Sequence, residues 1–408
     1  MKHEYKKASE LINDLKSIAE FGPRVITSDH FRFFAFGNDS ISIIGFEKFE
    51  EYLEKLESIY ALNKDLNATY SLKRFEEKII DLIRLVWDQK RETTPDDVEQ
   101  LFGQLLGVES VEFEIFRELF GAKLNIPQID FGDFTIYNVD LSKPALLQKY
   151  TVLETHEKLY FDKVTSNLLV SIKANAREKD KAIEVADLYF KSFDNVMSYV
   201  LADLSHKITV GIFNFRGYKL HSALACSKKS IGVQNRVEDR FEELDLQNRH
   251  LMDPKFGHEV IWNLITKKEK SGIEKRLLNA VEWIGKAVHE KDLPKGLFQF
   301  VIAIEGMLQF DEKAFINASI VSQLSEWLAF ILEDEPKKRK GVSKYVKDIY
   351  KKRSIIAHGR SPDVDIEDLK LALQISKRMT ISFLTKEPFK TFGTIEQLND
   401  YITELKFK

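Results

Sequence analysis

The feature that most constrains the fold is a change of pattern near Asn248. Before it, segments typical of strands alternate with segments typical of helices. After it, five or six amphipathic helical segments follow one another to about Lys386 without a strand signal. We therefore expect an α+β protein, with a mixed α/β module at residues 1–247, a helical bundle at 248–388 and an extension at 389–408.

Apolar spacing locates the expected elements. Alternating or aromatic runs predict strands, at 30–36, 111–116, 131–137, 168–172, 207–215 and 221–233. Helical spacing predicts helices at 46–56 and 182–201, and Thr94-Pro95 is typical of a helix start. In the last third, two core-facing stripes are expected, made by Ile273, Leu277, Val281, Ile284 and Val288, and by Ile316, Ile320, Leu324, Trp327 and Ile331.

Composition limits the possible classes of protein. A chain of 408 residues predicts two or three domains at about 150 residues each, and 44% hydrophobic residues argue against disorder. Lys and Arg number 61 against 64 Asp and Glu, so any nucleic-acid site must be local. The single cysteine, Cys226, excludes an intramolecular disulfide, indicates a reducing compartment and is expected to be a buried thiol.

Several familiar sites are missing from the sequence. No long apolar window and no apolar leader segment occur, so we expect a cytoplasmic protein without a membrane span. The phosphate-binding glycine motifs are absent, and no cofactor or metal is expected. Asp363-Val-Asp365 is open to two interpretations, a metal pair or a helix cap, and the cap is favoured. The histidines without ligand spacing are His156, His206, His221, His258 and His289.

The segment 342–359 combines an inward arginine with an outward histidine. At 3.6 residues per turn, one apolar stripe contains Val342, Tyr345, Val346, Ile349, Tyr350 and Ile356, and Arg353 falls on it. A second face carries Lys347, Lys351, Ser354 and His358. Gly359 favours the left-handed conformation that ends a helix, which places His358 on the last turn.

One acidic residue is expected to pair with that arginine. Glu305 falls on the buried side of an earlier helical segment defined by Leu297, Phe298, Val301 and Leu308. A buried carboxylate without a partner is costly, and Arg353 is the inward cation that we can name for it. Nine basic residues and one acidic residue lie between Lys337 and Arg353, a local net charge of +8 that indicates either phosphate binding or an ordinary solvated face.

These residues resemble the Apea-like branch of the HEPN superfamily. The resemblance rests on R-x4-H in Arg353-Ser-Ile-Ile-Ala-His358, the Asp-Ile-Tyr before it, Gly359 after it and the earlier Ala-Ile-Glu helix, and it covers about 270–388. It implies a helical bundle that forms a homodimer and a metal-independent endoribonuclease, a hydrolase serving as a toxin or an antiviral (antiphage) effector. The N-terminal module would then sense a phage-derived or protein trigger.

The resemblance also implies roles for individual residues. His358 would transfer the proton at the 2′-hydroxyl or the leaving oxygen, Arg353 would stabilise the phosphate and Glu305 would orient Arg353. Ser354 would support them, although family members often have Asn, Asp or His there, and Gly359-Arg360 replaces the H-x-Y pattern of antitoxin-controlled toxins. The basic residues expected to bind RNA are Lys344, Lys347, Lys351 and Lys352. The alternative is a non-catalytic scaffold that binds RNA or a protein partner, with Arg353 and Glu305 purely structural.

Overall fold

The computed structural model describes residues 2–23, 30–37, 39–150, 164–216, 219–226, 231–238, 242–310, 318–360 and 362–407. For residues 30, 219–226, 231–238 and 318–319 it describes the backbone alone. The fold is α+β, as the sequence predicts, and the chain divides into two compact units. The first contains residues 1–115 and 173–187, and the second contains residues 116–172 and 188–408.

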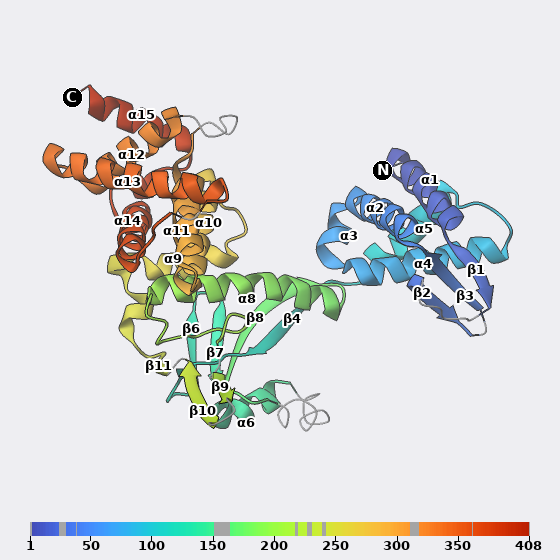
Figure 1. The fold of residues 1–408 in the computed structure, drawn as a ribbon. Coiled ribbons are helices and arrows are strands. Elements are labelled where there is room, and N and C mark those ends of the chain that lie inside the picture. The colour runs from blue at the N-terminus through green and yellow to red at the C-terminus, as the bar shows by residue number, and fades with distance from the viewer. Residues whose placement is uncertain are drawn as a thin grey trace. The chain divides into compact units, whose positions relative to one another are not determined.

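The first unit packs helices on a small antiparallel sheet (Figure 1). Its strand order is β1-β3-β2. The elements are α1 (Lys2–Ile18), β1 (Glu20–Pro23), β2 (His30–Phe36), β3 (Asp39–Ile44), α2 (Phe46–Leu62), α3 (Lys64–Thr69), α4 (Leu72–Asp88) and α5 (Pro95–Leu106). The predicted strand at 30–36 and the predicted helix at 46–56 are confirmed. Thr94 caps α5 with a capping box to Asp97, which confirms the predicted helix start.

A four-stranded sheet has the order β4-β8-β7-β6. The strands are β4 (Val111–Glu118), β6 (Gln128–Phe131), β7 (Phe134–Asn138) and β8 (Leu168–Ala176), and β4 and β8 confirm two predicted strands. The predicted strand at 131–137 is instead a hairpin that turns at Gly132. Gly132 has a φ of +61°, and a Cβ there would lie 2.8 Å from the carbonyl oxygen of Trp262, so only glycine fits this turn.

Helix α8 (Lys179–Leu201) supplies the core of the second unit. Ring contacts join Phe134 of β7 to Phe190 and Phe193 of α8, and Phe193 to Trp262 of α9 (His258–Thr266). All four side chains are buried. On α10 (Gly272–His289), a Cβ at Gly285 would lie 1.9 Å from the backbone oxygen of Asn195 in α8, so the two helices meet backbone to backbone.

The chain after Asn248 is helical in the described residues. It contains η1 (Arg249–Met252), η2 (Pro254–Phe256), α9, α10 (Gly272–His289), α11 (Leu293–Leu308), α12 (Ala318–Leu332), α13 (Pro336–Ala357), α14 (Ile366–Thr385), η3 (Phe389–Thr391) and α15 (Ile395–Lys406). The two predicted stripes are buried wherever side chains are described; Ile316 lies outside the described residues. The predicted boundary at 247/248 lies inside the second unit and remains a prediction.

The predicted strand at 207–215 is wrong. Within it only Gly211 forms a bridge, with Phe120. The next three backbone N–H groups, of residues 212 to 214, donate to the buried carboxylate of Asp194 at 2.7, 2.8 and 2.9 Å. A strand neighbour therefore has no donors left to pair with at these positions.

The remaining elements are a helix and the strands of two two-stranded sheets. They are β5 (Ala122–Lys123), α6 (Val139–Lys149), β9 (Lys219–Cys226), β10 (Ile231–Glu238) and β11 (Leu244–Asp245). The predicted strand at 221–233 is a hairpin of β9 and β10, whose connection at 227–230 lies outside the described residues, as does the side chain of Cys226. Within the described ranges, no helix is both long and apolar enough to cross a membrane.

Candidate functional site

Helix α13 ends where the sequence predicts. Gly359 has a φ of +73°, and its N–H donates to the carbonyl oxygen of Ile356 at 2.9 Å. The N–H of His358, the C-cap residue, donates to the carbonyl oxygen of Ser354 at 3.2 Å. The left-handed glycine thus closes the last turn and leaves His358 at the helix terminus.

Two opposite faces of α13 have different roles. Val342, Val346, Ile349 and Tyr350 are buried against the bundle, as predicted. Tyr345, which was expected on that stripe, is 49% exposed, because it lies at the margin of the stripe. The opposite face carries exposed side chains, among them Lys340, Lys344, Lys347, Lys351 and His358.

Arg353 lies in the middle of the buried stripe and pairs with Glu305 of α11. Its Nη2 is 3.1 Å from Oε2 of Glu305, and the two side chains are 12% and 17% exposed. This confirms the predicted pairing of the two residues. The hydroxyl of Tyr350 donates to the other oxygen, Oε1, of the same carboxylate. Burial, and then this bond to Glu305, raise the pKa of Tyr350, so the phenol remains protonated.

Aromatic rings cover the guanidinium of Arg353. Its Cζ lies 5.1 Å from the ring centre of Phe298 and 5.8 Å from that of Tyr350. The Nε of Arg353 is buried without a hydrogen-bond partner. The arginine is thus oriented by one carboxylate and two rings, and it keeps an unused donor.

His358 is arranged differently from Arg353. Its side chain is exposed and forms no hydrogen bond or ion pair with the part of the chain that the structure describes. His358 follows Arg353 by five positions, so the two side chains leave α13 on different faces. One copy of the chain therefore offers an exposed imidazole and a covered guanidinium, without contact between them among the described residues.

The predicted RNA-binding lysines fall into two groups. Lys344, Lys347 and Lys351 are exposed and form no ion pair with described residues. Lys352 instead places its Nζ 2.5 Å from Oδ2 of Asp368, at the start of α14. Its charge is therefore already neutralised. Ser354 is half-buried, and its backbone carbonyl, rather than its side chain, has the contact that holds the helix end.

Glu305 also lines an open hollow between α10 and α11. The other lining residues are Gly272, Lys275, Arg276, Gly306 and Gln309. Arg276 donates to the carbonyl oxygens of Gly306 and Gln309 at 3.2 and 2.9 Å, and it caps the C-terminus of α11. No sequence pattern indicates this role, because the contact joins two helices through backbone carbonyls.

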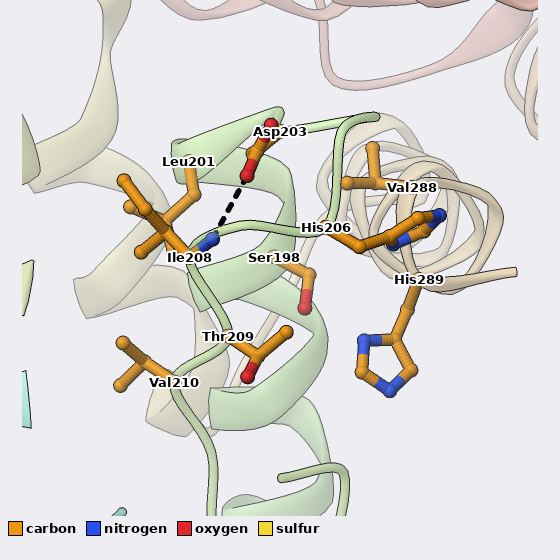
Figure 2. Close-up of a pocket in the computed structure, with 9 residues that line it drawn as sticks. All are labelled: Ser198, Leu201, Asp203, His206, Ile208, Thr209, Val210, Val288 and His289. Atoms are coloured by element: carbon orange, nitrogen blue, oxygen red, sulfur yellow. Dashed lines mark hydrogen bonds between the residues drawn. The ribbon is translucent and has the colours of Figure 1, made fainter. Parts of the chain in front are cut away.

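A second, smaller cavity lies at the end of α8 (Figure 2). Its volume is about 10 Å³, room for about one water molecule. His206 and His289 both line it, and burial, followed by the charges of Arg216 and His206, lowers the pKa of His289 to about 4. The carboxylate of Asp203 accepts the N–H of Ile208 at 2.9 Å, the dashed line in Figure 2. The cavity is too small for a substrate.

Lys377 of α14 is a further titratable group that the sequence did not reveal. Its Nζ donates to the carbonyl oxygens of Tyr199 and Val200, at 3.0 and 3.4 Å, at the C-terminus of α8. Burial lowers the pKa of Lys377 to about 8. The carbonyl groups of a helix terminus stabilise its charge, so we assign Lys377 to the packing of α14 on α8.

No metal site is apparent in the described ranges. They contain no group of three or more His, Cys, Asp or Glu side chains placed to hold a metal ion. Asp365 caps α14 in a capping box with Asp368, as predicted for the Asp363-Val-Asp365 segment. His156 and the side chain of His221 lie outside the described residues.

Comparison with known proteins adds no assignment: no protein-family model, no curated protein and no solved structure matches the chain.

Proposed function

We propose that the chain is a metal-independent endoribonuclease of the HEPN type. The observation that carries the proposal is the arrangement on α13, in which a row of exposed lysines leads to an exposed histidine at the helix end. One turn earlier, a carboxylate orients an arginine. Histidine titrates near neutral pH and guanidinium pairs with phosphate oxygens, so these are suitable groups for cleaving a phosphodiester.

The proposed reaction needs no group from outside the protein and the RNA. His358 takes the proton of a 2′-hydroxyl, and the 2′ oxygen attacks the adjacent phosphorus. The bond to the 5′ oxygen breaks, and the protonated imidazole of His358 returns the proton to that oxygen, which gives a cyclic phosphate end and a 5′-hydroxyl end. Arg353 stabilises the charge on the phosphate oxygens while Glu305 holds it in place.

The proposal also includes the oligomeric state of the protein and its biological role. Because Arg353 and His358 leave α13 on different faces, a two-fold homodimer that pairs the α13 termini offers a way to combine one chain's imidazole with a second guanidinium. The resemblance further favours a cytoplasmic toxin or antiphage effector with RNA as its partner. Its first unit would respond to a phage-derived or protein trigger.

One specific observation favours a second function. Arg353 is only 12% exposed and already paired with Glu305, as expected of an ion pair that fixes a bundle. On that basis the chain would be a non-catalytic scaffold that binds RNA or a protein partner through the lysine row.

Cleavage of total RNA by the full chain distinguishes the two functions. Wild-type protein should cut RNA in EDTA, leave cyclic phosphate ends and spare DNA, because the attacking group is the 2′-hydroxyl. His358→Ala should be at least about a hundredfold slower. The matched control is His3→Ala, which removes an exposed histidine from α1. Full activity of His358→Ala, or a strict need for magnesium, would contradict the nuclease proposal.

A further inference from the structure

A groove between α12 and α13 has no part in the chemistry proposed above. Its lining combines cations, hydroxyl groups and apolar surface, from Ser322, Ser325, Glu326, Ala329, Phe330, Pro336, Arg339, Lys340, Ser343 and Lys347. Glu326 is the single carboxylate among these lining residues, and the Nζ of Lys406 lies 2.7 Å from its Oε2. The groove therefore presents three cations whose charge no lining carboxylate cancels.

Arg339 is fixed in this groove. Its Nε donates to the carbonyl oxygen of Glu333 at 2.8 Å, and its Cζ lies 4.1 Å from the ring centre of Phe330. A stacked guanidinium and ring form a flat surface that suits the face of a nucleobase. The remaining donors of Arg339 stay available to a phosphate.

Lys340 and Lys347 connect the groove to His358. Both side chains are exposed and have no ion-pair partner in the described residues. Positions 340, 344, 347, 351 and 358 share one face of α13 because they follow one another at helical spacing. At a rise of 1.5 Å per residue, the row from Lys340 to His358 is about 27 Å long. At about 3.4 Å per stacked nucleotide, this length corresponds to about eight nucleotides.

We propose that the α12–α13 groove binds the backbone of single-stranded RNA and guides it along the lysine row to His358. The inference rests on the proposed function for its choice of RNA. A single strand fits better than a duplex, because the Arg339–Phe330 surface needs an unpaired base to stack on it. The groove thereby sets a minimum length for a well-bound substrate.

Binding of fluorescent oligouridines to the full chain tests the groove, with His358→Ala present in all proteins to prevent cleavage. The test variant is Lys340→Gln with Lys347→Gln, and the control is Lys268→Gln with Lys295→Gln, two exposed lysines outside the groove. The test variant should bind a 12-mer on the order of tenfold more weakly. It should also reduce the slope of log K against log salt concentration by about 1.4, which is the value for the loss of two contacts to single-strand phosphates. Phe330→Leu should weaken binding without changing that slope.

Length dependence completes the test. A 4-mer is too short to reach from the groove to His358, so the control should bind it much more weakly than it binds the 12-mer. If the wild-type chain cleaves RNA but the test variant and the control bind the 12-mer equally, the groove proposal is wrong and the nuclease proposal stands. If binding depends on the groove but the wild-type chain, with His358 intact, does not cleave RNA, the groove proposal stands and the nuclease proposal is wrong. If polyglutamate competes for the groove as strongly as the 12-mer does, the occupant is an acidic protein and not RNA.

Discussion

Arg353 donates a hydrogen bond to Glu305 at 3.1 Å, although 48 positions separate them in the sequence. The pair joins α13 to α11 inside the bundle, and the hydroxyl of Tyr350 shares the same carboxylate. Two ionised groups at this depth have lost much of their hydration, so each depends on the other. This dependence can be measured separately from catalysis.

Glu305→Gln should lower the free energy of unfolding by about 3 kcal/mol, because it leaves a largely buried guanidinium without its counter-charge. Arg353→Met added to Glu305→Gln should recover part of that loss, since apolar replacements of buried ion pairs are often tolerated. RNA cleavage should not return in the double variant. Urea denaturation of both single variants and the double variant measures this, and strictly additive losses would show that the two residues do not interact.

The assembly can be tested by light scattering and by the dependence of RNA cleavage on protein concentration. If each site needs two copies of the motif, the full chain should be a dimer at micromolar concentration in light scattering. RNA cleavage should then fall faster than linearly as the protein is diluted. A monomer whose activity stays linear in protein concentration would argue against the shared site.

His258 should make stability depend on pH. It is fully buried, its Nδ1 is 2.7 Å from the carbonyl oxygen of His250, and burial, with the charge of Lys377 adding to it, lowers the pKa of His258 to about 4. Unfolded histidine titrates near 6.5, so between these values the unfolded chain binds more protons and the free energy of unfolding falls as pH falls. The contribution of His258 to this fall in the free energy of unfolding should be about 2 kcal/mol between pH 7.5 and 5.

His258→Asn retains a donor for the carbonyl of His250 and removes the titration. The variant should lose less stability than the wild type between pH 7.5 and 5 in urea denaturation. His289, whose pKa is also lowered to about 4, leaves a remaining dependence in both proteins. An identical pH dependence in the two proteins would rule out the role given to His258.

Asp194→Ala should destabilise the second unit by at least about 3 kcal/mol, because it leaves three backbone N–H groups without an acceptor. Asp194→Asn keeps one acceptor oxygen and should lose less. Hydrogen exchange at residues 212–214 should be faster in the alanine variant than in the asparagine variant. Unchanged exchange there would mean that these N–H groups do not depend on Asp194.

Local chemistry determined which features the sequence could predict. The caps at Thr94 and Asp365 were predictable because a cap involves residues three positions apart. The Arg353–Glu305 pair followed from helical spacing, since each residue lies on a buried stripe. The strand expected at 207–215 was wrong because a carboxylate in a distant helix takes its donors. The sequence predicts that Lys352 binds RNA, but Lys352 pairs with Asp368 of the next helix. Helical spacing within α13 does not reveal a partner on another helix.

Because segments of the two units alternate along the chain, the protein cannot be divided into its units by a single cut. The first unit is discontinuous, since residues 173–187 belong with residues 1–115. Arg177, in the later segment, donates to the hydroxyl of Thr69 at 2.6 Å and to the carbonyl of Val108 at 2.8 Å, and Glu178 accepts the N–H of Ser71. A fragment ending at residue 115 lacks these contacts. An autonomous version needs both segments spliced by a short linker, and no single protease cut can release either unit intact.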